Sequence, residues 1–259
     1  MDSFVLKASI AGWELLCYVA LIYIMLCRHR PPRTSTYKLL VVFSIIRIIS
    51  CSAQIATTAT GSDISQTVAI AAGFFSLSPL LLAAHDILSR VYFSMHRVPL
   101  NNPAVLCVVL FAQLPIITAL ILCIVGVAST STSADITNQN HSMGGGMIFY
   151  LTDFAIIAIL TILTGARRYI THYRDEITLF HALAASIPLL LLRLIYSILL
   201  VFSDEFISLV AKVTLASFFT ELFMERVVEM TVVLLFLYAS LSQRGHDMRE
   251  NEEKLAMAV

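Results

Sequence analysis

Ionisable side chains interrupt apolar runs that are long enough to cross a bilayer. Each such residue at the centre of a membrane helix costs roughly 2.5–3.5 kcal/mol on insertion scales. Eight of them facing lipid would cost on the order of 20–28 kcal/mol. We therefore expect these residues to face one another or a polar cavity inside a helix bundle, where function would lie. They are Glu14, Arg47, Asp153, Arg193, Glu221, Glu225, Arg226 and Glu229.

An acidic ladder stands out among them. Glu221, Glu225 and Glu229 recur at every fourth residue, which places them on one helical face over roughly 12 Å. Like charges at that spacing repel, so cations must lie near. Arg47 and Arg193, on other apolar runs, are the expected counter-ions.

Acids outnumber bases inside these runs. Arg226 projects away from the ladder, where it can pair with Asp153 or Glu14. Five acids against three arginines leave at least two carboxyls without a cation. A carboxyl without a partner in an apolar pocket retains its proton near neutrality and is a ready general acid. The same property suits a proton-coupled carrier, whereas fully paired charges would only fix helix register and rotation.

Composition predicts an all-α membrane protein. The chain has 259 residues, of which 58% are hydrophobic and 13% charged, about half the charge of a soluble domain. Apolar blocks of about 20 residues fit the hydrocarbon core as helices. We expect one seven-helix transmembrane domain over residues 1–240 and a tail over 241–259. The expected spans are 8–27, 38–60, 66–88, 104–128, 147–166, 178–202 and 212–240.

Loop charges predict the orientation. Loops 28–38, 89–103 and 167–177 and the tail carry the Lys and Arg residues, whereas the other loops carry none. The positive-inside rule then places the N-terminus outside or in a lumen and the C-terminus in the cytosol. We expect the endoplasmic reticulum or another endomembrane. Asn140, in the sequon of loop 129–146, is a predicted glycosylation site.

Depth along the spans can also be estimated. Glu14, Asp153, Glu221 and Glu225 are expected in the non-cytosolic half, and Arg47, Arg193 and Glu229 nearer the midplane. His85 is expected near the cytosolic end of its span, as a helix-end histidine. Asp86 and Arg90 are spaced for a local salt bridge.

Helix breakers fall inside or beside the spans. Pro79, Pro115 and Pro188 are expected to kink them. The run Gly144–Gly146 before the fifth span is typical of a flexible hinge.

Absent motifs narrow the chemistry. There is no aspartate-rich cluster for a metal-bound diphosphate and no nucleic-acid module, so we expect neither a metal nor another cofactor. The predicted partners are the lipid bilayer and an apolar prenylated small molecule. The sequence does not predict an oligomeric state.

Several short motifs resemble those of a fungal family of seven-span membrane proteins of unknown function. They are Ser76-Leu77-Ser78-Pro79-Leu80-Leu81-Leu82 with Ile87-Leu88-Ser89-Arg90, Arg47 within Ile-Ile-Arg-Ile, Leu192-Arg193-Leu194-Ile195-Tyr196, and Met224-Glu225-Arg226-Val227-Val228. In size and topology the chain is also similar to membrane-bound terpene cyclases of fungal meroterpenoid pathways, of the ascochlorin and ascofuranone type.

The cyclase resemblance implies a metal-independent ring closure of an epoxidised prenyl chain. A buried carboxyl would protonate the epoxide while water is excluded. Glu225 or Glu229 is the expected acid, with Asp153 or Glu14 as alternatives. Arg193, Arg47, Glu221 and Tyr196 would give electrostatic support or contact the substrate.

Two other function classes remain open. A small-solute or proton-coupled transporter would use the same carboxyls for coupling. A seven-span receptor or sensor would use the cavity for a ligand and its basic loops for a partner.

Overall fold

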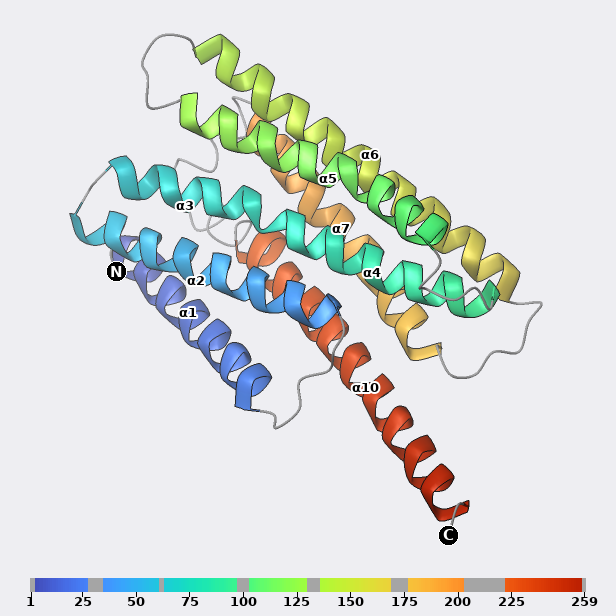
Figure 1. Cartoon of the computed structure of the whole chain (residues 1–259). Coiled ribbons are helices and arrows are strands. Elements are labelled where there is room, and N and C mark those ends of the chain that lie inside the picture. The colour runs from blue at the N-terminus through green and yellow to red at the C-terminus, as the bar shows by residue number, and fades with distance from the viewer. Residues whose placement is uncertain are drawn as a thin grey trace.

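The chain forms a bundle of helices. The computed structural model describes residues 3–27, 35–60, 63–96, 103–129, 136–168, 177–202 and 222–257. These ranges are helical throughout, apart from a turn at Ser76. Successive segments run in alternate directions (Figure 1). In this part of the chain the expected all-α architecture of seven helical segments is confirmed.

Two of the segments consist of paired elements, and the other five are single helices. The elements are α1 (Ser3–Cys27), α2 (Ser35–Thr60), α3 (Asp63–Phe75) with α4 (Leu77–His96), α5 (Pro103–Ser129), α6 (Ile136–Arg168), α7 (Ile177–Phe202), and the π-helix η1 (Leu222–Val227) with α10 (Val228–Met257).

Within the described residues, five apolar stretches are long enough to cross a membrane by length and composition. They are Ala8–Met25, Ser35–Thr57, Ala71–Phe93, Ser142–Ala166 and Ile177–Phe202, and α5 adds a shorter one, Phe111–Val127. The protein is thus a multi-pass membrane protein that contacts lipid.

The segment made of α3 and α4 is the centre of the bundle. Its stretch Ala71–Phe93 is 78% buried, against 28–39% for the other four long stretches. α4 packs on α2, α5, α6 and α7, while α1 lies on α2, and α10 packs on α7 and α2. A polar side chain on α4 therefore meets protein rather than lipid.

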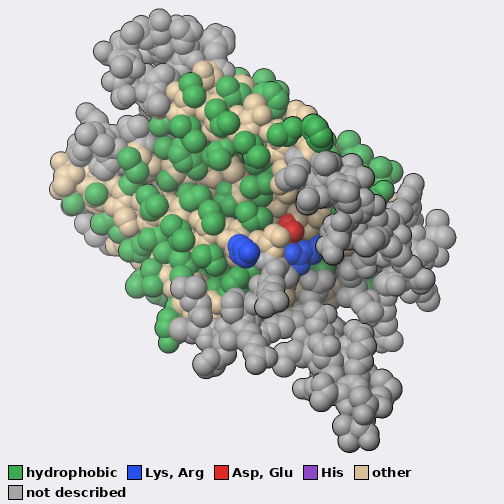
Figure 2. Space-filling model, in the orientation of Figure 1, with side chains coloured by type: hydrophobic (Ala, Val, Ile, Leu, Met, Phe, Trp, Pro, Cys, Tyr) green, Lys and Arg blue, Asp and Glu red, His purple; other side chains and the backbone are tan. Residues whose placement is uncertain are grey.

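The outer surface is apolar. Large hydrophobic side chains such as Trp13, Phe111 and Ile162 are about 70% exposed. Figure 2 shows hydrophobic side chains spread over the described part of one face, with the few visible charges gathered in one place. Such a surface matches hydrocarbon and would be unstable in water.

Pro79 explains the interruption of the central segment. Proline has no N–H, and its ring collides with the carbonyl four residues earlier, here that of Phe75. α3 ends at Phe75, and α4 restarts at Leu77, which leaves Pro79 in a first turn that tolerates it. Pro115 and Pro188, by contrast, lie inside α5 and α7 without ending either helix.

The glycine run Gly144–Gly146 is part of helix α6, so its prediction as a hinge was wrong. A Cβ on Gly146 would lie 2.7 Å from Cys123 Sγ and 3.0 Å from the Ala119 carbonyl oxygen. The missing side chain lets α5 and α6 approach closely, as small residues do in membrane bundles.

Gly146→Ala is therefore expected to destabilise the protein by about 1–3 kcal/mol, because the new methyl group has no room. Gly145→Ala is the matched control, since its Cβ would meet only Leu122 Cδ1, at 3.7 Å. Thermal unfolding in detergent measures both. Equal melting temperatures for the two variants would contradict the close packing.

Two predicted span limits were too short. α4 continues to His96 beyond the predicted end at 88, and α6 begins at Ile136 rather than 147. Arg90 consequently lies in α4, and Asn140 lies in α6 instead of a loop. The side chain of Asn140 lies outside the described residues, and its glycosylation stays a prediction.

The seventh segment is described from Leu222, so Glu221 and the first part of the predicted span 212–240 lie outside the described residues. α10 passes the predicted boundary at 240 and continues to Met257. Its C-terminal part extends away from the other helices (Figure 1).

Candidate functional site

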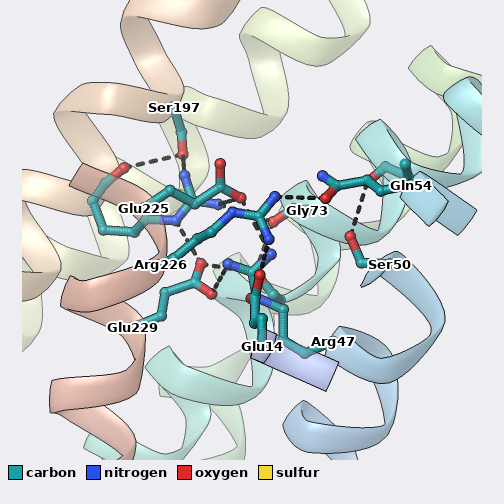
Figure 3. A network of polar contacts seen from close by, with 12 residues as sticks. Glu14, Arg47, Ser50, Gln54, Gly73, Ser197, Glu225, Arg226 and Glu229 are labelled. Carbon is teal, nitrogen blue, oxygen red and sulfur yellow. Dashed lines mark hydrogen bonds and ion pairs between the residues drawn. The ribbon is translucent and has the colours of Figure 1, made fainter. Parts of the chain in front are cut away.

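Six charged side chains from four helical segments meet in the middle of the bundle. We call them the charge cluster: Glu14 of α1, Arg47 of α2, Arg193 of α7, and Glu225, Arg226 and Glu229 of η1 and α10. In Figure 3 the labelled side chains of Glu14, Arg47, Arg226 and Glu229 point toward one another between the helices.

Glu229 is the most tightly held carboxylate of the cluster. Its Oε1 accepts hydrogen bonds from Arg193 Nε at 2.5 Å and from Ser76 Oγ at 3.1 Å. Its Oε2 forms an ion pair with Arg47 Nη2. The Glu229 side chain is only 1% exposed. Two charge-assisted contacts in such a dry place keep this carboxylate ionised.

Glu225 is held differently. A single oxygen, Oε1, accepts from Arg47 Nη1 and from Arg193 Nη2, each at 3.2 Å. Its side chain is 13% exposed, whereas those of its two arginine partners are 1% and 3% exposed. Glu225 is thus the looser and more accessible of the two carboxylates that share these arginines.

Arg226 connects the outer helix α1 to the cluster. Its Nη1 forms an ion pair with Glu14 Oε2, and its Nη2 donates to Gln54 Oε1 at 2.6 Å. Glu14 Oε1 also lies 3.8 Å from Arg47 Nε. Of the two partners predicted for Arg226, the structure selects Glu14.

Both irregular backbone segments adjoin this cluster. Glu225 and Arg226 lie in the π-helical turn η1, a feature that occurs often at functional sites. Near the break at Ser76, the carbonyl of Gly73 accepts a hydrogen bond from Arg193 Nη2 at 3.1 Å. Irregular backbone at this depth is tolerated where protein groups satisfy it.

Arg193 is the most connected residue of the cluster. Its Nη1 donates to Ser197 Oγ at 2.7 Å, and its Cζ lies 5.7 Å from the centre of the Tyr196 ring. The guanidinium therefore contacts two carboxylates, a backbone carbonyl, a hydroxyl and an aromatic face. Tyr196, predicted as electrostatic support, contacts the cluster through Arg193.

The charges of the cluster balance. Three arginines face three carboxylates, so within the described residues the expected excess of acid is not present at this place. Asp153, the fourth described acid of the predicted set, lies elsewhere and contacts no arginine there. Arg47 and Arg193 are the counter-ions of Glu225 and Glu229, as predicted.

Asp153 forms a second buried site with a histidine. Its Oδ1 lies 2.8 Å from His85 Nε2, and its side chain is fully buried. Its Oδ2 has no hydrogen-bond partner among the described residues. The neighbouring turns add a contact of 2.5 Å between Ser78 Oγ and the Tyr150 hydroxyl. α4 and α6 are thus joined by two polar contacts.

The predicted depths of these two residues were wrong. His85 was placed near the cytosolic end and Asp153 in the opposite half, yet they touch. α4 and α6 extend beyond the predicted spans, so both residues lie well inside the apolar stretches Ala71–Phe93 and Ser142–Ala166. The prediction did not recognise that α4 lies at the centre of the bundle. A histidine on a central helix needs a buried partner.

The predicted pair of Asp86 and Arg90 is confirmed, with 2.8 Å between Asp86 Oδ2 and Arg90 Nη2. The same oxygen accepts the backbone N–H of Thr36 at 2.8 Å, in the first turn of α2. Asp86 therefore caps α2 from a different helix, which is a structural role.

Comparison with known families covers almost the whole chain. Residues 6–246 match the model of DUF7702, described as a domain of unknown function. The chain belongs to the DUF7702 family. This membership agrees with the predicted resemblance to a family of unknown function. No curated protein matches the chain.

Proposed function

We propose that this protein is a proton-coupled carrier of a small solute, with the charge cluster as its substrate and proton site. The observation that carries this proposal is the position of Glu225. It is the most accessible carboxylate of a buried cluster, with 13% of its side chain exposed, and its Oε1 is shared by two arginines.

Proton uptake by Glu225 would open the cluster while leaving the tighter contacts of Glu229 in place. The proton removes the negative charge that faces Arg47 Nη1 and Arg193 Nη2 and leaves both guanidinium groups with a free N–H. Glu229 still holds each arginine from its other side. The site is thereby prepared for a solute without being dismantled.

The backbone around the site supports the same proposal. Discontinuous helices near the middle of the membrane form the substrate sites of many secondary transporters. Here the break between α3 and α4 and the π-helical turn η1 both contact the cluster through Gly73, Glu225 and Arg226. Two irregular segments at one place give the backbone alternatives that a carrier needs.

The proposal includes the orientation expected from the loop charges. The N-terminus would face the lumen of an endomembrane, and the three basic loops would face the cytosol. A proton gradient across that membrane would drive transport of the solute.

Transport in proteoliposomes tests the proposed function. The purified protein is reconstituted into vesicles that enclose a pH-sensitive dye, and small solutes are added outside under an inward proton gradient. We expect protons to enter with a solute, at a rate that saturates with its concentration. If, for every class of solute added, protons entered vesicles with the protein no faster than vesicles without it, the protein would not be a carrier.

A second candidate function, the predicted cyclase, is favoured by one observation. The free oxygen of Asp153, Oδ2, is buried without a hydrogen-bond partner among the described residues. Glu225, Glu229 and Glu14 are instead each paired with arginines. We propose Asp153, supported by His85, as the acid if the protein is an enzyme.

The corresponding reaction balances without an external reagent. The Asp153 carboxyl would protonate the epoxide oxygen of an epoxidised prenyl chain, and the C–O electron pair would move to that oxygen as a hydroxyl forms. An alkene would then attack the carbocation and close a ring. Loss of one proton from the final cation would return the proton that Asp153 gave.

Microsomes that contain the protein and an epoxyfarnesyl phenol test this candidate. We expect a cyclised product, which Asp153→Asn abolishes while protein levels stay unchanged. A full yield of product from Asp153→Asn would exclude Asp153 as the acid, and no product from the natural protein would exclude this cyclisation.

A further inference from the structure

We propose that the carried solute is a small monocarboxylate anion, which replaces the Glu225 carboxylate between Arg47 and Arg193. This inference rests on the proposed function and names the substrate class of the same site. It follows from the contacts of Glu225, the charge balance of the cluster and the geometry of guanidinium groups.

The contacts show which carboxylate can be exchanged. Arg193 holds Glu229 at 2.5 Å but Glu225 at 3.2 Å, and Arg47 Nη1 also holds Glu225 at 3.2 Å. Glu229 is 1% exposed and Glu225 13%. A solute carboxylate can reach the position of Glu225 and displace a weaker pair of contacts.

The site is already shaped for a carboxylate. The planar N–H donors of a guanidinium group match the two oxygens of a carboxylate better than they match a spherical anion such as chloride. Arg47 Nη1 and Arg193 Nη2 converge on one point, where they now bind a carboxylate oxygen. A solute of the same chemistry needs no new donors.

Charge balance sets the sign and size of the solute's charge. With Glu225 protonated, Arg47, Arg193 and Arg226 face only Glu14 and Glu229, so one buried positive charge lacks a partner. Such a charge costs several kcal/mol. One monovalent anion restores neutrality, whereas a cation or a divalent anion does not.

Among the described residues, the other groups around Glu225 do not supply that charge. Glu229 and Arg226 are on its own segment, and α1 contributes Glu14 and Tyr18. The remaining elements contribute neutral groups besides the two arginines: Cys51 and Gln54 of α2, the Gly73 carbonyl of α3 and Ser197 of α7.

Proton and anion therefore assist each other at this site. Glu225 must take up a proton before the anion can replace its carboxylate. By linkage, the affinity for the anion therefore rises as pH falls, by up to about tenfold for each pH unit. Because one proton accompanies one monovalent anion, the transport step moves no net charge.

Binding of pyruvate to the purified protein tests the inference, since pyruvate stays ionised across the relevant pH range. Calorimetry is run between about pH 5.5 and about pH 7.5, where linkage predicts an affinity change of about tenfold or more. We expect the natural protein to bind more tightly at the lower pH. Glu225→Gln should bind pyruvate equally at both pH values.

Two controls separate other causes. Glu252→Gln, the same chemical change in the C-terminal part of α10, should keep the pH dependence. His85→Gln should keep it too, because His85 pairs with Asp153 outside the cluster. If His85→Gln removed the pH dependence and Glu225→Gln retained it, the assignment to Glu225 would be wrong.

The outcomes distinguish this inference from the proposed function. Pyruvate binding with the expected pH dependence but no flux in vesicles would support the anion site and contradict the carrier. Solute-coupled proton flux with no carboxylate binding, or with chloride binding as tightly as pyruvate, would support the carrier and overturn the monocarboxylate. The unfolding temperature shows whether Glu225→Gln is folded. If it is not, the pH dependence of pyruvate binding to the natural protein tests the inference by itself, and binding that does not change with pH would overturn it.

Discussion

Replacing Arg193 by methionine is expected to remove most of the folded protein from the membrane. The substitution deletes the contacts with Glu229 at 2.5 Å, Glu225 at 3.2 Å and the Gly73 carbonyl at 3.1 Å. It leaves the buried carboxylates with too few cations. Breaking a buried pair in this way costs about 3–5 kcal/mol, a large part of the roughly 5–15 kcal/mol that stabilises a typical protein.

Size-exclusion chromatography of fluorescently tagged protein measures the effect as the loss of the monodisperse peak. Arg90→Met is the matched control. The pair of Arg90 with Asp86 is more accessible, at 20% and 16% exposure, and Asp86 keeps its hydrogen bond from the Thr36 backbone N–H when Arg90 is removed. We therefore expect a peak close to that of the natural protein.

A second substitution shows whether the unpaired charge causes the loss of folded protein in Arg193→Met. Arg193→Met combined with Glu229→Met removes both partners of the contact at 2.5 Å, and a buried pair replaced by apolar residues is often tolerated. We expect the double variant to recover part of the peak lost by Arg193→Met. An unchanged peak for Arg193→Met alone would contradict the role of Arg193 as the centre of the cluster.

Glu225→Gln is expected to abolish uphill transport driven by a proton gradient. Glutamine keeps the size of the side chain but cannot take up or release a proton, so solute movement is no longer linked to protons. Accumulation of solute in vesicles should fall at least about tenfold, while exchange of solute at equal pH continues. Radiolabelled solute measures both quantities in one preparation.

Two further variants sharpen this result. Glu252→Gln should transport normally. Glu229→Gln should instead lose folded protein, because Glu229 is 1% exposed and holds both arginines. Proton-driven accumulation that persists in a folded Glu225→Gln variant would remove Glu225 from the coupling mechanism.

The helical segments could be predicted because membrane spans are set by apolar length. Their ends could not. α4 continues past the predicted end at 88 and includes Arg90, whose charge is paired with Asp86, while Asp86 caps α2. α6 begins at Ile136 in a polar stretch rich in residues of low helix propensity, so neither apolar length nor propensity marks its start.

The cluster was partly predictable for the same physical reason. Buried charges must meet opposite charges, which brought Arg47 and Arg193 to the ladder residues Glu225 and Glu229. The sequence could not show that Arg226 would choose Glu14 over Asp153, because that choice depends on helix rotation. The π-helical turn that contains Glu225 and Arg226 changes that rotation locally, and no sequence pattern predicted it.

The second site was missed because it depends on which helix is central. His85 resembled a helix-end histidine while the predicted span ended at 88. Once α4 is known to lie inside the bundle, both His85 and Ser78 require buried partners, which Asp153 and Tyr150 provide.

The number of protons taken up when the anion binds tests the coupling most directly. Calorimetric titration of pyruvate in buffers with different ionisation enthalpies gives this number. The paired geometry of Glu225, Arg47 and Arg193 predicts an uptake of about one proton per pyruvate in the natural protein and about none in Glu225→Gln. Binding of pyruvate without proton uptake in the natural protein would contradict it.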